Sequence, residues 1–170
     1  SEELLQQRNV APKSIINNEL ILKRNGINIK TMQEMEKTAP EKLNNTFASI
    51  VRPNENKFTA LHYANVSEGI IITIPENIEI KEPIIVTTFL SQGISFSHLF
   101  ILGGKNSKAT IIHNFKTEPV EKAAEKSPPQ VVSAASFTSA ITELDVQEGS
   151  TIEYASIQTL PNTFHVAAFR

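Results

Sequence analysis

The stretch EGIIITIPENIEIKEPIIVTTF, residues 68–89, contains three short runs of isoleucine and valine, and Pro75 and Pro83 interrupt them. β-Branched residues favour strands. Proline has no N–H to offer a sheet ladder, so it favours corners between strands. The stretch therefore predicts very short strands joined by sharp corners. The side chains expected to line the interior are those of Ile72, Ile74, Ile78, Ile80, Ile84 and Val86.

The composition is that of an ordinary globular protein of one domain, or of one domain with an appendage. Among 170 residues, 40% are hydrophobic and 20% are charged, and the net charge is −2. Such a balance lacks the clustered basic surface that binds nucleic acid. The chain has no cysteine, which excludes disulfides and thiolate metal sites from it. It also lacks an apolar run of membrane-spanning length and a signal-peptide pattern, so we expect a cytoplasmic protein.

Residues 1–64 are expected to form an N-terminal region with a hairpin and short helices. Asn25-Gly26 lies between two short apolar runs, a pattern typical of a tight hairpin turn. Two short helices are expected next, over residues 32–37 and 40–50, and another helical turn over residues 57–64.

Two capping boxes are expected to begin the first two of these helices. Thr31 with Glu34 and Thr38 with Glu41 each have the required spacing. Pro40 would occupy the first turn of the second helix, where its missing N–H has no cost.

Residues 65–170 read as a series of short strands separated by Gly, Pro, Asn and Ser. The expected strands cover residues 70–74, 78–80, 84–89, 99–102, 109–112, 131–132, 141–146, 151–157 and 164–169. The segment at about residues 115–130 is rich in proline and charge, so we expect a flexible inserted loop there.

Residues 101–112 (ILGGKNSKATII) and 144–155 (LDVQEGSTIEYA) can be aligned without a gap. Repeated strand-turn-strand units are typical of a coil in which each unit covers the one before. From the pattern alone, a parallel β-helix and a sandwich or barrel both remain open. The lack of hairpin signals in this region favours the β-helix.

Five segments, in order from residue 27 to the end, resemble the SufB/SufD family of iron–sulfur cluster assembly proteins. The segments are INIKTMQEMEKTAPEKL (27–43), KFTALHYAN (57–65), GIIITIPENIEIKEPI (69–84), SHLFILGGKNSKATIIHNF (97–115) and SAITELDVQEGSTIEYASIQTLPNTFHVAAFR (139–170). Each motif is a weak signal alone, but their order and spacing are specific. The absence of cysteine favours a SufD-like or archaeal-type member.

This resemblance implies a right-handed parallel β-helix, here truncated, and a non-catalytic scaffold or assembly role in the SUF system. Family members are longer than this chain, so it is expected to be a fragment that lacks the reactive C-terminal half. The implied partners are a SufB/SufD-type protein and the SufC ATPase. The family's cluster-assembly residues lie later in the β-helix, so no catalytic, cofactor-binding or metal residue is assigned here. No cofactor is expected in this fragment, since the complete complex handles the iron–sulfur cluster.

An exposed last rung at residues 164–170 would leave an open strand edge, so we also expect self-association through that end. The alternative function is that of a β-helix carbohydrate-binding or carbohydrate-active protein. The aromatic content of this chain is 6%, with no tryptophan, which is low for a carbohydrate-binding protein.

Four histidines, His62, His98, His113 and His165, are the candidate ligands in this chain. A coil could bring His98 near His113, but two histidines without a carboxylate make a poor metal site, so a structural role is favoured. His165 lies where the family also has histidine, and a core or turn role is expected for it.

Other polar motifs favour ordinary structural roles. Gly103-Gly104-Lys105 lacks the frame of a phosphate-binding loop and predicts a turn. Glu143, Asp145 and Glu148 are expected on a solvated face. No serine-hydrolase elbow is present. Met32 and Met35 are expected to pack the first short helix onto one end of the β-region.

Overall fold

The structure is a computed structural model that describes residues 11–66, 68–90, 93–117 and 136–170. It is mainly β, with helices confined to the N-terminal part, as the sequence predicts. The helices are α2 (Glu19–Arg24), α3 (Met32–Thr38), α4 (Pro40–Thr46) and α5 (Lys57–Asn65). The strands are β1 (Lys13–Ile16), β2 (Asn28–Thr31), β3 (Gly69–Ile74), β4 (Ile84–Leu90), β5 (Ile94–Gly103), β6 (Lys108–Thr117), β7 (Ser136–Val146), β8 (Thr151–Thr159) and β9 (Thr163–Phe169).

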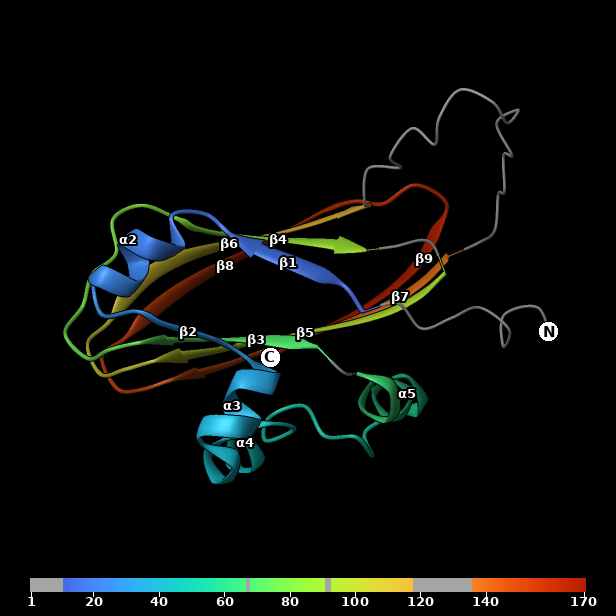
Figure 1. Cartoon of the computed structure of the whole chain (residues 1–170), viewed down its shortest axis with the longest axis horizontal. Helices are drawn as coiled ribbons and strands as arrows, with labels where there is room; N and C mark the ends of the chain where they lie inside the picture. Colours follow the sequence, from blue (N-terminus) through green and yellow to red (C-terminus); the bar gives the residue numbers. More distant parts are fainter. Residues whose placement is uncertain (1–10, 67, 91–92, 118–135) are drawn as a thin grey trace.

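The strands form two sheets that lie face to face (Figure 1). One sheet has the order β1-β4-β6-β8 and the other has the order β2-β3-β5-β7-β9. From β3 onward, consecutive strands alternate between the sheets, and neighbours within each sheet run parallel. The first strand of each sheet is the exception, because β1 and β2 pair antiparallel with β4 and β3.

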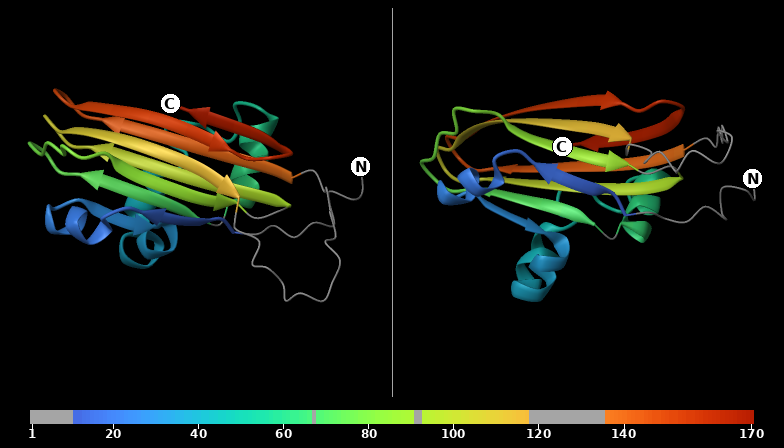
Figure 2. Two further views of the ribbon diagram at one scale, coloured as in Figure 1. Left: turned by 90° about the horizontal axis from the view of Figure 1, so that it is seen from above. Right: turned by 45° about the horizontal axis from the view of Figure 1, so that its top comes forward.

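Helices α3, α4 and α5 lie on the outer side of the five-stranded sheet (Figures 1 and 2). The middle of this sheet is therefore covered on both faces, and β5 is buried along most of its length, whereas every residue of β9, at the edge, is at least partly exposed. Met35 packs there against Ile71 and Phe100, with Met32 beside them. The two methionines thus fix α3 to a sheet face. The expectation that they pack on one end of the β-region is wrong.

Aliphatic side chains from both sheets fill the space between them. Ile72, Ile74, Ile84 and Val86 are at most 1% exposed, while Ile78 and Ile80 pack against this core partly buried. Alternate residues of β4 point inward, which matches the two-residue period of a strand. The predicted interior positions are therefore confirmed.

The internal repeat stacks in register. Ile101 pairs with Leu144 and Lys108 pairs with Thr151, so the two repeat copies lie side by side over their whole length. Asn106 and Gly149 occupy the same turn position, with φ angles of 55° and 74°. Glycine adopts such angles without strain. A Cβ at Gly149 would also lie 2.2 Å from Asn106 Oδ1, so close stacking favours glycine there.

Pro75 and Pro83 both lie outside strands, at the predicted corners. The strand expected at residues 78–80 is reduced to a single bridge, between Glu79 and Lys108. The corner itself is stabilised by the Asn106 side chain, which donates to Asn77 Oδ1 at 3.1 Å. The segment between the two prolines is therefore mostly a turn.

The hairpin expected at Asn25-Gly26 is wrong, because the preceding residues form α2. Asn25 ends this helix and Gly26 follows with a φ of 85°, while the Ile27 N–H donates to the Leu22 carbonyl. An Asn-Gly pair can end a helix as well as form a hairpin, since both need positive φ. The flanking strands β1 and β2 pair with distant strands in different sheets instead of with each other.

Helices α3, α4 and α5 confirm the expected helical segments, although α4 ends at Thr46. The Thr31–Glu34 capping box forms, and Pro40 occupies the first turn of α4. The second capping box is wrong. Thr38 is the last residue of α3, where its hydroxyl donates back to the Glu34 carbonyl at 2.7 Å, and the N-cap of α4 is Ala39, whose side chain makes no capping hydrogen bond.

The flexible loop expected at residues 115–130 begins within β6, which ends at Thr117. The rest of it, and the strand expected at residues 131–132, lie outside the described residues.

Candidate functional site

Glu143 is fully buried on β7, facing the helical layer. Its Oε2 accepts hydrogen bonds from the N–H groups of Ile50 and Val51, at 2.8 and 3.1 Å. Its Oε1 accepts from the Tyr63 hydroxyl at 2.9 Å and lies 3.0 Å from His98 Nε2. The carboxylate therefore joins α5 and the segment before it to the five-stranded sheet.

The expectation that Glu143 lies on a solvated face is wrong, whereas Asp145 and Glu148 are exposed as predicted. Burial alone would raise the pKa of the Glu143 carboxyl, but the donors from His98, Ile50 and Val51 outweigh it and lower that pKa. Glu143 is therefore ionised at neutral pH. Its negative charge is satisfied by hydrogen bonds instead of water.

The network continues through two histidines. His98 Nδ1 lies 3.3 Å from His62 Nε2, and His62 Nδ1 lies 3.0 Å from Ser139 Oγ. Burial and the neighbouring His98 lower the pKa of His62 to about 3, so its ring is neutral at neutral pH. Because the ionised Glu143 can only accept, His98 Nε2 donates to it. With the proton of neutral His62 on Nε2, His62 donates to His98 and Ser139 donates to His62.

This order of serine, histidine, histidine and carboxylate has the form of a nucleophile with its base. Two properties do not favour catalysis, however. The first is that the His62 imidazole, with a pKa of about 3, is a weak base at neutral pH. His62 is also fully buried, and Ser139 is only 3% exposed. We therefore interpret the chain of hydrogen bonds as the attachment of α5 to the sheet.

A second polar cluster lies between the two sheets, around His113 of β6. His113 Nε2 lies 2.8 Å from Thr88 Oγ1, and His113 Nδ1 lies 3.1 Å from the Tyr154 hydroxyl. Thr142 Oγ1 lies a further 3.1 Å from Tyr154, and Ser14 Oγ lies 2.9 Å from Thr88 Oγ1. Burial lowers the pKa of His113 to about 4, with a smaller contribution from His165. The cluster is thus an uncharged chain across the interior.

The proximity of His98 and His113 that a coil would allow does not occur, because they lie in different sheets and their rings face different layers. His98 contacts the helical layer and His113 faces the interior. His165 Nδ1 is 2.6 Å from Thr138 Oγ1, a contact between the neighbouring strands β9 and β7. Within the part of the chain that the structure describes, no group of three or more His, Asp or Glu side chains could hold a metal ion.

Gly103 and Gly104 lie at the end of β5 and in the turn to β6, as predicted. The Gly104 N–H donates to the Ile74 carbonyl at 2.8 Å, and a Cβ on Gly104 would lie 2.6 Å from Glu76 N. Close stacking of this turn on the preceding one therefore explains the glycine.

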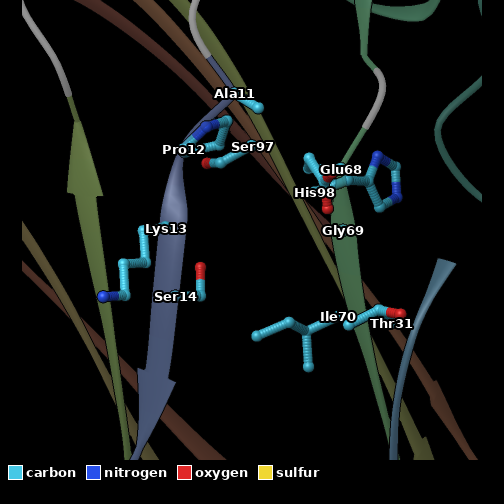
Figure 3. Close-up of a pocket in the computed structure, with 10 residues that line it drawn as sticks. All are labelled: Ala11, Pro12, Lys13, Ser14, Thr31, Glu68, Gly69, Ile70, Ser97 and His98. Carbon is cyan, nitrogen blue, oxygen red and sulfur yellow. The ribbon is translucent and has the colours of Figure 1, made fainter. Parts of the chain in front are cut away.

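A pocket of about 280 Å³ opens between the first strands of the two sheets (Figure 3). Its lining comes from β1, the end of β2, β3 and β5, together with the residues just before β1 and β3. The lining residues are Ala11, Pro12, Lys13, Ser14, Thr31, Glu68, Gly69, Ile70, Ser97 and His98. Ser14 also belongs to the His113 chain, so the pocket is connected by hydrogen bonds to the interior.

The sequence reasoning missed both polar clusters. The available signal was the two-residue period of β7, which places Glu143 on the same face as the buried Ile141. For Ser14 and Ser97 no sequence signal was available, because their neighbours come from other strands.

Comparison with models of known protein families finds none that matches this chain, and comparison with curated proteins finds no match either. Among the described residues, no helix is long and apolar enough to cross a membrane.

Proposed function

We propose that this chain is part of a non-catalytic scaffold component of the SUF iron–sulfur cluster assembly machinery. The observation that carries the proposal is the ordered set of five motifs between residue 27 and the last residue. On this proposal the protein is cytoplasmic and acts by binding a SufB/SufD-type partner and a SufC-type ATPase. The iron–sulfur cluster is the cargo of the complete complex, and no residue of this chain is assigned to hold it.

The strand arrangement supports this proposal at the level of fold. From β3 to β9 the chain alternates between two sheets, and each strand pairs in parallel with the next strand of its own sheet. The stacked repeat, with Asn106 and Gly149 at the same corner, adds a second sign of regular coiling. We propose that this arrangement is the beginning of a right-handed parallel β-helix.

The proposed function is tested with the natural protein that carries this chain, expressed in its own host with an affinity tag. We expect it to copurify with a SufC-type ATPase and a SufB/SufD-type protein, and we expect its depletion to lower the activity of iron–sulfur enzymes. An unrelated transporter ATPase, expressed at the same level, is the control for non-specific capture. Absence of both partners together with unchanged iron–sulfur enzymes would refute the proposal.

We also propose self-association through the last described strand. Among the described strands β9 lies at the edge of its sheet, and its Phe164 and Phe169 side chains are 60% and 54% exposed. Open edges of this kind recruit other strands. Light scattering of the 170-residue chain should give a mass above that of the monomer, and Phe169→Asp should lower it. Leu20→Asp, at a 75% exposed position on α2, is the matched control. A monomer at high concentration would exclude this mode.

A further inference from the structure

The pocket between β1 and β3 contains a buried hydroxyl without a hydrogen-bond partner among the residues that the structure describes. Ser97 of β5 is 5% exposed, and its Oγ has no hydrogen-bond partner among the described residues. An unsatisfied buried hydroxyl costs about 1–3 kcal/mol, so such groups usually bind water or a ligand. Ser97 lines the pocket, but its Oγ is buried, so a guest contacts it only after a small movement of the pocket wall.

Ser14 supplies a second hydroxyl on the opposite wall. Figure 3 shows Ser14, Ser97 and Ile70 in the same space, with Ser14 on β1. Ser14 Oγ is 2.9 Å from Thr88 Oγ1, and Thr88 is bonded to His113. The pocket therefore offers a bound molecule two hydroxyls, that of Ser14 from the four-stranded sheet and that of Ser97 from the five-stranded sheet.

The row of hydrogen bonds that links Ser14, Thr88 and His113 can take either of two donor directions. If His113 Nε2 accepts, Thr88 donates to it and Ser14 donates to Thr88, which leaves the Ser14 oxygen as an acceptor for the pocket. If His113 Nε2 carries the proton, every bond reverses and Ser14 donates into the pocket. A neutral histidine allows both states, so Ser14 can match either a donor or an acceptor on the guest.

Charged groups around the pocket are directed elsewhere. In Figure 3 the Lys13 side chain extends to the other side of β1 from Ser97 and Ile70. The Glu68 carboxylate accepts a hydrogen bond from Gln33 at 2.7 Å. An anionic guest would therefore be buried without a counter-charge, and a cationic guest would have to compete with Gln33 for the Glu68 carboxylate, so both are disfavoured.

We propose that this pocket binds a small uncharged molecule that carries a hydroxyl or carboxamide group. Ser97 and Ser14 hold the polar group, and Ile70 and Pro12 contact its apolar part. The volume of about 280 Å³ is at the lower limit of ligand sites, so the guest is smaller than a drug-sized molecule. This site does not depend on the proposed scaffold function, since none of its lining residues lies on β9, the strand proposed for self-association.

The test is a nuclear magnetic resonance titration of the full chain with four small probes: acetamide, glycerol, acetate and methylammonium. We expect saturable shifts of the Ser97, Gly69 and Ile70 amides with acetamide or glycerol and none with the two ions. Removing the Ser97 hydroxyl should weaken binding by roughly fivefold or more, the equivalent of one lost hydrogen bond.

The chain offers a matched control on the same strand. Ser95 Oγ is also buried without a partner among the described residues, but Ser95 does not line the pocket. Ser95→Ala should therefore leave probe binding unchanged, while Ser97→Ala weakens it. Both variants remove an unsatisfied hydroxyl, so both should keep the thermal stability of the original chain, and a melting curve checks this.

Three results would overturn the proposal. One is the absence of saturable shifts with any neutral probe, which would mean that the pocket holds water only. Another is equal binding of the charged and neutral probes. The last is an equal effect of Ser95→Ala and Ser97→Ala on binding.

Ser97→Thr is a second test if Ser97→Ala proves unstable, because threonine keeps the hydroxyl but fills part of the pocket. It should weaken the binding of glycerol, the larger probe, more than the binding of acetamide. The opposite order would also overturn the proposal.

Discussion

Replacing the buried Glu143 with glutamine should lower stability by about 2–3 kcal/mol, whereas alanine should cost about 4 kcal/mol or more. The carboxylate accepts from two backbone N–H groups, Tyr63 and His98. Hydrogen bonds to a charged group contribute about 1.5–3 kcal/mol each, and neutral ones about 0.5–1.5 kcal/mol. Loss of the charge therefore weakens every bond, and relief from burying a charge offsets part of this loss.

Glutamine can be accommodated without an orphaned group. Its carbonyl oxygen can accept from the Ile50 and Val51 N–H groups, while its amide donates to His98 Nε2 and to the Tyr63 oxygen. The Tyr63 hydroxyl then donates to the Val51 carbonyl, which lies 2.7 Å away. His98 then donates through Nδ1 to His62, and His62 donates to Ser139, so both histidines change tautomer. Alanine offers no acceptor, so it leaves buried N–H groups unsatisfied and also opens a cavity.

Urea denaturation measured by far-UV circular dichroism provides the free energies of unfolding. Tyrosine fluorescence is a second probe, because the chain has no tryptophan. Glu148→Gln, on an exposed turn, is the control and should stay within about 0.5 kcal/mol of the original chain. If Glu143→Gln is as stable as this control, or as damaging as Glu143→Ala, the account of the network is wrong.

Three further perturbations address other parts of the fold. Folding lowers the pKa of His62 to about 3 and of His113 to about 4, so the unfolded chain binds more protons below pH 6.5. Stability should therefore fall by about 1.6 kcal/mol for each of these two histidines between pH 6.5 and 5. In denaturation curves, His113→Gln should remove the contribution of His113 and leave that of His62. Gly104→Ala should lower the free energy of unfolding by about 1–3 kcal/mol, because the new Cβ would meet backbone atoms. Gly103→Ala should lower it less, because its Cβ would meet only side-chain atoms, at 3.3 Å or more. Equal losses of stability for the two variants in melting experiments would contradict the stacking argument. Thr31→Ala removes the cap of α3 and should cost about 1 kcal/mol, while Thr31→Ser should restore most of it; no difference between the two would mean that the cap contributes nothing.

Local signals in the sequence were sufficient for the elements whose causes lie within a few residues. The β-branched runs predicted β3 and β4, and the spacing of Thr31 and Glu34 predicted the start of α3. Pro75 marked a corner because proline cannot contribute to a ladder. The gapless repeat indicated stacked units, and its two copies lie side by side in β5 and β7.

What only the tertiary structure decided depends on contacts between distant residues. Asn25-Gly26 suits a hairpin or a helix end equally well, and the pairing of β1 and β2 with strands of different sheets decided for the helix end. Glu143 looked like a surface charge because its donors come from Ile50, Val51 and Tyr63, about 80 to 93 residues away. A charge is buried only where such donors converge, and their convergence is a property of the folded chain.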